Sequence, residues 1–292
     1  MESSQISLEL LNDQNFDAVK KIRRDDINED WVDGMDAIME TTRYGMEHHC
    51  QGHTYAVKHG ETYIGVILLG EAFPWATDPD EMKQVPFYRL MNFVIDSRYR
   101  NRGIGGYVLE LVIAAIYQEF GVRPIALGVH RDNHSAARFY TNHGFLKTNV
   151  MEGNDYYFLR YPVKLDGLTL TDIQPSQFYL SQAKIANIHA WFDPTDLSTF
   201  DPIPVKYLNG RVIFTDGHTR AWVAHSAGLK TIPLAWDPDA LDWDLYQLCV
   251  DACRERGVYS VSDLHNKILS EPDYEEKWIH WCDEMQKTAK GR

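Results

Sequence analysis

The sequence predicts a two-domain protein of the α/β (α+β) class, and three observations support this prediction. The chain has 292 residues, more than a single domain usually contains. Its composition, with 44% hydrophobic and 24% charged residues, is typical of a folded globular protein. Strand-like apolar runs alternate with helical patterns along the chain. We place the domain boundary in the short polar link at residues 164–167, which gives domains at residues 1–165 and 166–292.

The first domain is predicted to form a sheet with flanking helices. The predicted strands span residues 6–11, 54–57, 62–69, 89–96, 125–130, 145–150 and 156–161. The predicted helices span residues 13–22, 31–47, 103–120 and 134–143, and Asp13 or Asn15 can cap the first of them. Residues 71–80 are irregular and aromatic. They form either a plain surface loop or the lining of a substrate pocket.

A glycine-rich turn joins the strand at 89–96 to the helix that follows. The residues of this turn are Arg100, Asn101, Arg102, Gly103, Ile104, Gly105 and Gly106. Glycines let backbone amides approach an anion, and the N-terminus of the next helix adds the positive end of its dipole. The turn therefore predicts a pyrophosphate site, although glycines at such a turn can also serve geometry alone.

A second motif follows about one strand beyond that helix. Residues 133–145 match N-x-x-A-x-x-F-Y-x-x-x-G-F, and residues 100–105 match R-x-x-G-x-G. With this order and separation, residues 5–162 resemble the GNAT acyltransferase superfamily. The resemblance implies a mixed sheet with flanking helices, acetyl-CoA as cosubstrate and N-acetyltransferase activity on a primary amine.

The resemblance also implies roles for individual residues. The implied acetyl-CoA-binding residues are Phe93, Val94, Ile95, Arg100, Asn101, Arg102, Gly103, Ile104, Gly105, Gly106 and Asn133. Amides of the three strand residues would bond the pantetheine arm and stabilise the oxyanion, unless these residues are core strand alone. Asn133 would bond the pantetheine arm or cap the next helix. Tyr140 matches the position that protonates the departing thiolate in many relatives, or else packs its helix against the sheet.

The general base is not determined by either motif. An amine acceptor is mostly ammonium at neutral pH and must lose a proton before it attacks the thioester. Glu71 and Asp96 are the candidate carboxylates, although Asp96 can instead pair with Arg98 or Arg100. Because no cysteine falls in either motif, we expect direct attack in a ternary complex without an acyl-enzyme. Some relatives that modify protein N-termini carry a glutamate where this chain has Gly128, which argues against such an acceptor.

The second domain carries a different pattern. A P-I-x-V strand, a hairpin turn at 208–211, D-G-H-x-R at 216–220 and an I-P-L strand together resemble the ParB/sulfiredoxin fold. The resemblance implies a phosphate- or nucleotide-binding pocket formed by Gly217, His218 and Arg220 at a helix N-terminus. Gly217 stands where sulfiredoxin has its catalytic cysteine, so reductase activity is not expected. The alternative is that Asp216 caps a helix and Arg220 makes a structural ion pair.

Composition limits the partners. The net charge is −13, both domains are acidic, and no basic tract appears, so nucleic acid is an unlikely partner. No apolar run approaches the roughly 20 residues of a membrane span, and we expect a cytoplasmic protein without a membrane partner. Cys249 and Cys253 lie on an apolar helix face, which favours buried thiols over a metal site.

The overall hypothesis is an acetyl-CoA-dependent N-acetyltransferase that needs no metal. Its acceptor is a small-molecule amine or a peptide amine, and a homodimer is left open. Two alternatives belong to other classes of protein. One is a non-catalytic acyl-CoA-binding sensor, and the other is a nucleotide- or nucleic-acid-associated protein that acts through the ParB-like domain.

Overall fold

The computed structural model describes residues 5–28, 30–237, 239 and 241–290. It divides into two compact units, unit 1 at Met1–Pro162 and unit 2 at Val163–Arg292. The domain limits 1–165 and 166–292 stay a prediction. Each unit is described by itself.

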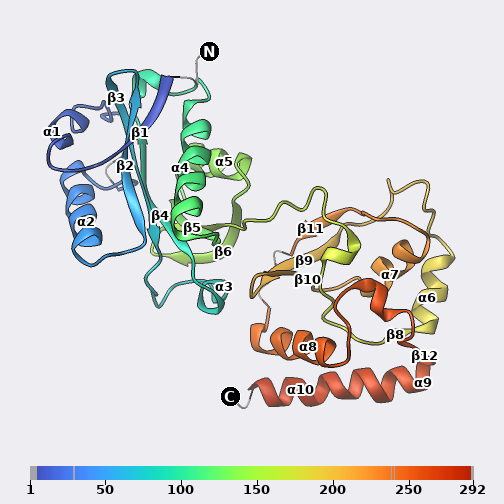
Figure 1. Ribbon diagram of the computed structural model, residues 1–292. Helices are drawn as coiled ribbons and strands as arrows, with labels where there is room; N and C mark the ends of the chain where they lie inside the picture. Colours follow the sequence, from blue (N-terminus) through green and yellow to red (C-terminus); the bar gives the residue numbers. More distant parts are fainter. Residues whose placement is uncertain (1–4, 29, 238, 240, 291–292) are drawn as a thin grey trace. The chain divides into compact units, whose positions relative to one another are not determined.

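Unit 1 is built on a mixed seven-stranded sheet, which confirms the predicted mixed α/β class (Figure 1). The strand order is β1-β2-β3-β4-β5-β7-β6. The strands are β1 (Ile6–Leu10), β2 (Gly52–His59), β3 (Thr62–Glu71), β4 (Tyr88–Ile95), β5 (Ile125–His130), β6 (Leu146–Glu152) and β7 (Asp155–Arg160). β4 and β5 are parallel, and the other neighbours in this sheet are antiparallel.

Helices cover both faces of this sheet (Figure 1). They are α1 (Phe16–Val19), α2 (Met35–Glu47), α3 (Asp80–Gln84), α4 (Ile104–Phe120) and α5 (His134–Asn142). α2 buries Met35, Ile38, Met39 and Thr42, a helical spacing that forms one apolar stripe against the sheet. This helix begins later than the predicted residue 31, because Gly34 has an extended backbone and occupies the N-cap position.

Unit 2 contains a three-stranded sheet of order β10-β9-β11 and a two-stranded sheet of β12 and β8. The strands are β8 (Leu180–Ser181), β9 (Ile203–Leu208), β10 (Arg211–Phe214), β11 (Leu234–Trp236) and β12 (Ile268–Leu269). The helices are α6 (Gln182–His189), α7 (His218–Ser226), α8 (Trp243–Glu255), α9 (Glu271–Tyr274) and α10 (His280–Lys290), with a π-helical turn at Glu275–Ile279. The strand predicted at 231–235 begins only at Leu234, because Pro233 has no amide to donate to a ladder.

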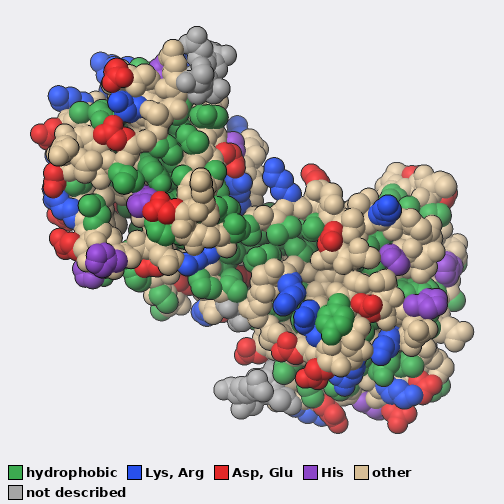
Figure 2. All heavy atoms as spheres, viewed as in Figure 1, with side chains coloured by type: hydrophobic (Ala, Val, Ile, Leu, Met, Phe, Trp, Pro, Cys, Tyr) green, Lys and Arg blue, Asp and Glu red, His purple; other side chains and the backbone are tan. Residues whose placement is uncertain are grey.

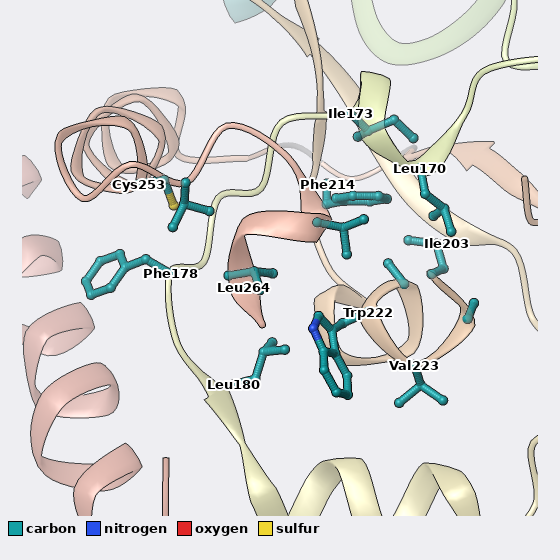
Figure 3. Packing of buried hydrophobic residues seen from close by; sticks show 14 of the residues in the cluster. Leu170, Ile173, Phe178, Leu180, Ile203, Phe214, Trp222, Val223, Cys253 and Leu264 are labelled. Carbon is teal, nitrogen blue, oxygen red and sulfur yellow. The ribbon is translucent and has the colours of Figure 1, made fainter. Parts of the chain in front are cut away.

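The core of unit 2 joins these short elements. Phe214 of β10, Ile203 of β9 and Val223 of α7 are completely buried in one cluster, to which Leu264 also belongs (Figure 3). Cys253 of α8 lies in the same cluster, and burial raises the pKa of its neighbour Cys249 to about 12. Neither cysteine forms a disulfide, and burial keeps both thiols protonated. The described residues contain no group of three or more His, Cys, Asp or Glu side chains arranged to hold a metal ion.

Candidate active site

The parallel strands β4 and β5 separate after a short contact. They pair only at Tyr88–Ile125 and Arg89–Ala126, whereas β4 pairs with β3 along its whole length. The β3–β4 register skips Met91, so this residue forms a bulge. A cavity of about 840 Å³ lies at the separation and is lined by β4, β5, the segment before α2 and the first turns of α4 and α5.

Two backbone amides of β4 face this gap. The Asp96 amide donates to the Ile64 carbonyl of β3 at 2.7 Å. Because backbone groups alternate in direction along a strand, the amides of Phe93 and Ile95 point away from β3, where β5 no longer pairs. The Ile95 carbonyl also points away from β3, since it accepts a hydrogen bond from Arg100 Nε at 2.6 Å. Val94 differs, because its amide faces β3 and its side chain is buried in the core beneath α2.

The glycine turn leaves the N-terminus of α4 open. Gly103 occupies the N-cap position with φ of 78°, and no side chain caps the helix. Free amides at a helix start, together with the helix dipole, form an anion site. The members of the turn that line the cavity are Arg100, Asn101, Gly103, Gly105 and Gly106. Arg102 and Ile104 do not line it.

Packing against the segment after α5 also requires a glycine at position 106. A Cβ added there would lie 2.4 Å from His143 Cε1 of the segment after α5, a distance that real side chains do not reach. A Cβ on Gly105 would meet Phe139 Cε2 at 3.4 Å, which is close to ordinary contact. Gly106 thus allows α4 to approach α5, whereas a small side chain at Gly105 costs little packing.

Arg100 is held in place by the protein itself. Its Nη1 donates to Asp26 Oδ2 at 2.6 Å, and its Nε donates to the Ile95 carbonyl. Its Nη2 is buried and has no hydrogen-bond partner among the described residues. The two N–H groups of Nη2 therefore remain for a ligand, and Asp26 balances part of the positive charge.

The second motif supplies two side chains at the start and middle of α5. Asn133 Oδ1 accepts from the Ala136 amide at 3.0 Å, so Asn133 caps the helix. It also lines the cavity. Tyr140 lines the same cavity and is 8% exposed. Burial raises the pKa of Tyr140 well above its usual value, so the phenol is protonated at neutral pH.

Asp96, a candidate base, is occupied by other contacts. It is completely buried, its Oδ2 lies 2.7 Å from Arg98 Nη2, and it accepts from the amides of Arg23 and Arg98. The hydrogen bonds from the Arg98 side chain, and then those amides, hold the pKa of Asp96 well below its usual range despite its burial. Asp96 does not line the cavity, and a carboxylate so stabilised is a weak base. The structure thus replaces that prediction with its alternative, the pairing with Arg98.

Glu71, the other candidate base, lies elsewhere in unit 1. It ends β3 and lines a second cavity of about 640 Å³, not the cavity at the strand separation. Burial and then the Glu71 carboxylate raise the pKa of Cys50 in that second cavity. The structure therefore does not bring Glu71 together with Phe93, Ile95 and Tyr140.

His130, an imidazole that lines the first cavity, belongs to neither sequence motif. It ends β5 and lines the cavity, with its ring centroid 6.2 Å from that of Trp31. Its Nδ1 accepts from the Asp132 amide at a long 3.3 Å. The available signal was its position, since a titratable residue at the carboxyl end of a strand commonly faces a ligand crevice in α/β proteins.

The residues predicted to bind an anion in unit 2 are not equivalent. His218 is buried, its Nε2 accepts from the Ser176 amide at 3.0 Å, and burial lowers its pKa to about 4. A neutral imidazole that accepts from the Ser176 amide brings no positive charge to a phosphate, which argues against His218 as a member of the predicted pocket. Arg220 donates from Nη1 to the Asp201 carbonyl at 2.9 Å, and Gly217 begins α7 with φ of 72°.

We expect the burial of His218 to make unit 2 sensitive to acid. Its pKa falls from 6.5 to about 4 on folding, so the unfolded chain binds the proton more tightly. The stabilisation is complete above pH 6.5 and is lost as pH falls towards 4, by an amount on the order of 3 kcal/mol. Thermal unfolding followed by tryptophan fluorescence between these pH values measures it. His218→Gln keeps an acceptor for Ser176 and should show a weaker pH dependence, and equal slopes would contradict this account.

These features define a domain with a split parallel strand pair, a glycine turn and a tyrosine around one cavity. The model of the acetyltransferase (GNAT) family matches residues 16–145. The match lies inside unit 1 and covers less than half of the chain, so it identifies a GNAT acetyltransferase domain in unit 1 and does not classify unit 2. A search of curated proteins found no significant match.

Solved structures with some similarity to the chain include three acetyltransferases. The PaiA N-acetyltransferase of Thermoplasma acidophilum, in complex with coenzyme A, has 16% identity and a TM-score of 0.40 over 53% of this chain and 98% of that chain. A GNAT family acetyltransferase of Elizabethkingia anophelis with acetyl-CoA bound has 16% identity and a TM-score of 0.36, over 55% and 99%. The spermidine N-acetyltransferase of Vibrio cholerae, in complex with CoA and spermine, has 12% identity and a TM-score of 0.39, over 54% and 94%. With TM-scores below 0.5, these similarities do not decide the fold or substrate of this chain.

Proposed function

We propose that unit 1 transfers the acetyl group of acetyl-CoA to a primary amine by direct attack in a ternary complex. The observation that carries this proposal is the separation of β4 from β5. Because β5 no longer pairs with β4 there, the amides of Phe93 and Ile95 face a cavity that also reaches the glycine turn and Tyr140. The family match supports acetyl transfer as the reaction class.

Binding of the cosubstrate follows from the lining of the cavity. The open amides at the start of α4 and the remaining Arg100 donor would hold the pyrophosphate. The pantetheine arm would run along β4, with Asn133 as a further partner. An amide of β4 aimed at the thioester oxygen would stabilise the negative charge that develops on it during attack.

The chemical step needs a proton donor for the leaving group. The neutral amine nitrogen attacks the thioester carbon and then releases a proton to solvent. The tetrahedral intermediate collapses to the amide as the carbon–sulfur bond breaks. Tyr140 gives its proton to the departing thiolate, and solvent returns a proton to the phenolate afterwards. Burial keeps the phenol protonated at neutral pH, but a raised pKa also makes Tyr140 a weaker acid. The assignment therefore rests on the place of Tyr140 in the cavity and not on its pKa.

We further propose that His130 takes the proton from the ammonium form of the acceptor, directly or through a water. It is the imidazole on the β5 side of the cavity, next to Trp31 and the segment before α2. The carboxylates of this cavity are less suitable. Asp26 is paired with Arg100, and Glu110 is paired with Arg160.

His130→Gln should lower kcat/KM for an amine by about 10²-fold at neutral pH, because a general base is lost. The affinity for acetyl-CoA should be unchanged, and the deficit should shrink as rising pH deprotonates the amine itself. Steady-state thiol release across a pH series measures both effects. Asp132→Asn keeps the imidazole and its amide contact and should retain activity, while a deficit that is constant with pH would assign His130 a structural role.

The experiment that tests the proposed function is thiol release from acetyl-CoA in the presence of candidate acceptors. The panel contains polyamines, amino acids, aminoglycosides and short peptides. Tight acetyl-CoA binding without thiol release for any acceptor would favour the alternative, a non-catalytic acyl-CoA sensor.

For unit 2 we keep the ParB/sulfiredoxin resemblance as a proposal, with any phosphate contact limited to Arg220 and the backbone at Gly217. We also keep the prediction that nucleic acid is an unlikely partner. On the face shown in Figure 2, Lys and Arg side chains of the described residues are scattered among Asp and Glu side chains and form no single basic patch. Among the described residues, no helix has the length and apolar character to span a membrane. The cytoplasmic location and a homodimer stay predictions.

A further inference from the structure

Unit 1 contains a second cavity that the proposed reaction leaves unused. Its volume of about 640 Å³ is enough for a small organic ligand. It is lined by the ends of β1 and β3, the start of β2, the last turns of α2 and the C-terminus of α4. Five large hydrophobic side chains exposed to solvent belong to this lining, namely Leu10, Tyr44, Met46, Phe73 and Met91.

The concentration of exposed apolar groups at one cavity is unusual. Met46 is 64% exposed and Tyr44 is 51% exposed, although both lie beside a concave surface. Large apolar patches that remain exposed on a soluble domain commonly mark ligand-binding grooves. The carboxylates of the lining are partly engaged, since Glu119 lies 2.9 Å from His53 Nε2 and Glu71 lies beside the Cys50 thiol. The lining thus favours an apolar occupant over a polycation.

Met91 connects this cavity with the candidate active site. It lines both cavities, and it is the bulged residue at the point where β4 leaves β5. The alternation of faces is interrupted at this bulge, since Leu90 is buried in the core beneath α4 and the Asn92 side chain donates to Asp33, just before α2. Leu68, which lines the second cavity, lies on the α2 side of the sheet, because Val66, two residues earlier on β3, belongs to the core beneath α2. Because Met91 lines both cavities, a ligand of sufficient length at the strand separation can pass Met91 and reach the second cavity.

We propose that the second cavity holds the body of the acceptor, and that this acceptor is a primary monoamine on an elongated apolar chain. The proposal rests on the proposed function of unit 1. The amino group lies at the strand separation, where it attacks the thioester carbon and its proton leaves to His130 or water. The apolar chain extends past Met91 and is buried between α2 and the end of β3.

Gly45 of α2 offers a direct test, because it lines the second cavity and not the first. An added Cβ would find its nearest neighbour, Cys50 Cβ, at 3.9 Å, so a side chain at this position enters open space. Gly45→Phe should fill part of the cavity, and helical positions accept residues other than glycine readily. Gly45→Ala is the matched control, since it adds one methyl group and leaves the cavity open.

The measurement is kcat/KM for a series of n-alkylamines from propylamine to octylamine, with spermidine for comparison. In the unmodified protein kcat/KM should rise by about fourfold for each methylene buried. In Gly45→Phe this dependence on chain length should disappear, while turnover of propylamine and the affinity for acetyl-CoA persist. Gly45→Ala should keep the dependence. Met46→Glu, which places a charge on an exposed side chain of the same lining, is a second variant and should also reduce it.

Each result separates the two proposals. If amines are acetylated but chain length has no effect, or the same dependence persists in Gly45→Phe, the second cavity is not the acceptor site and the proposed function stands. Preference for spermidine over octylamine would also overturn the apolar assignment. If no amine releases thiol, the proposed function fails. Calorimetry of octylamine with the CoA-bound protein then tests the cavity alone. Binding that is lost in Gly45→Phe would show that the cavity holds apolar amines, and binding that persists in Gly45→Phe would show that it does not.

Discussion

Gly105→Val should abolish acetyl-CoA binding, with an expected loss of affinity of at least about 10²-fold. A branched side chain in the first turn of α4 stands between the pyrophosphate and the amides that would bind it, and each lost bond to a charged group is worth about 1.5–3 kcal/mol. Gly105 lines the cavity, and an added Cβ lies 3.4 Å from the Phe139 ring, so the helix has room for a Cβ at this position. Isothermal calorimetry with acetyl-CoA measures the effect.

Gly105→Ala is the matched control for this experiment. One methyl group makes nearly ordinary contact with Phe139 and leaves most of the anion site open, so affinity should change little. The melting temperatures of both variants should stay close to that of the unmodified chain. Unchanged affinity in a folded Gly105→Val protein would refute the assignment of the glycine turn to the pyrophosphate.

Tyr140→Phe should lower kcat by about 10²-fold and leave the affinity for acetyl-CoA nearly unchanged. The substitution keeps the ring that contacts Phe139 and Phe145 and removes only the proton donor. Because the leaving thiolate then takes its proton from water, the deficit should appear in kcat and not in cosubstrate binding. Steady-state thiol release and calorimetry together separate these two effects.

Tyr156→Phe is the control, since Tyr156 packs against the same core and does not line the cavity. It should behave like the unmodified protein. Should Tyr140→Phe turn over at the full rate, Tyr140 would be a packing residue, and the proton donor would have to be sought among the other groups of the cavity.

Local features of the candidate site could be predicted from the sequence because they depend on neighbours along the chain. Gly103 ends the turn and begins α4 at the expected place, and Asn133 caps α5 through the Ala136 amide. The mixed α/β class followed from the alternation of apolar runs and helical patterns. Element limits were less certain, as the later start of α2 shows, since Gly34 changes the backbone direction at a position where periodicity gives no signal.

Contacts between residues far apart in the chain decided which candidate site residues are available for chemistry. Asp96 is withdrawn from catalysis by Arg98 and the Arg23 amide, and Glu71 lies in a separate cavity. His218 is neutral because the folded core of unit 2 buries it against Ser176. By itself the sequence determined the glycine turn, the helix caps and the types of residue available for chemistry, since these depend on short-range geometry. Only the tertiary structure decided where β4 leaves β5, which charges are neutralised and which cavities have Met91 in their lining, because burial and pairing depend on residues far apart in the chain.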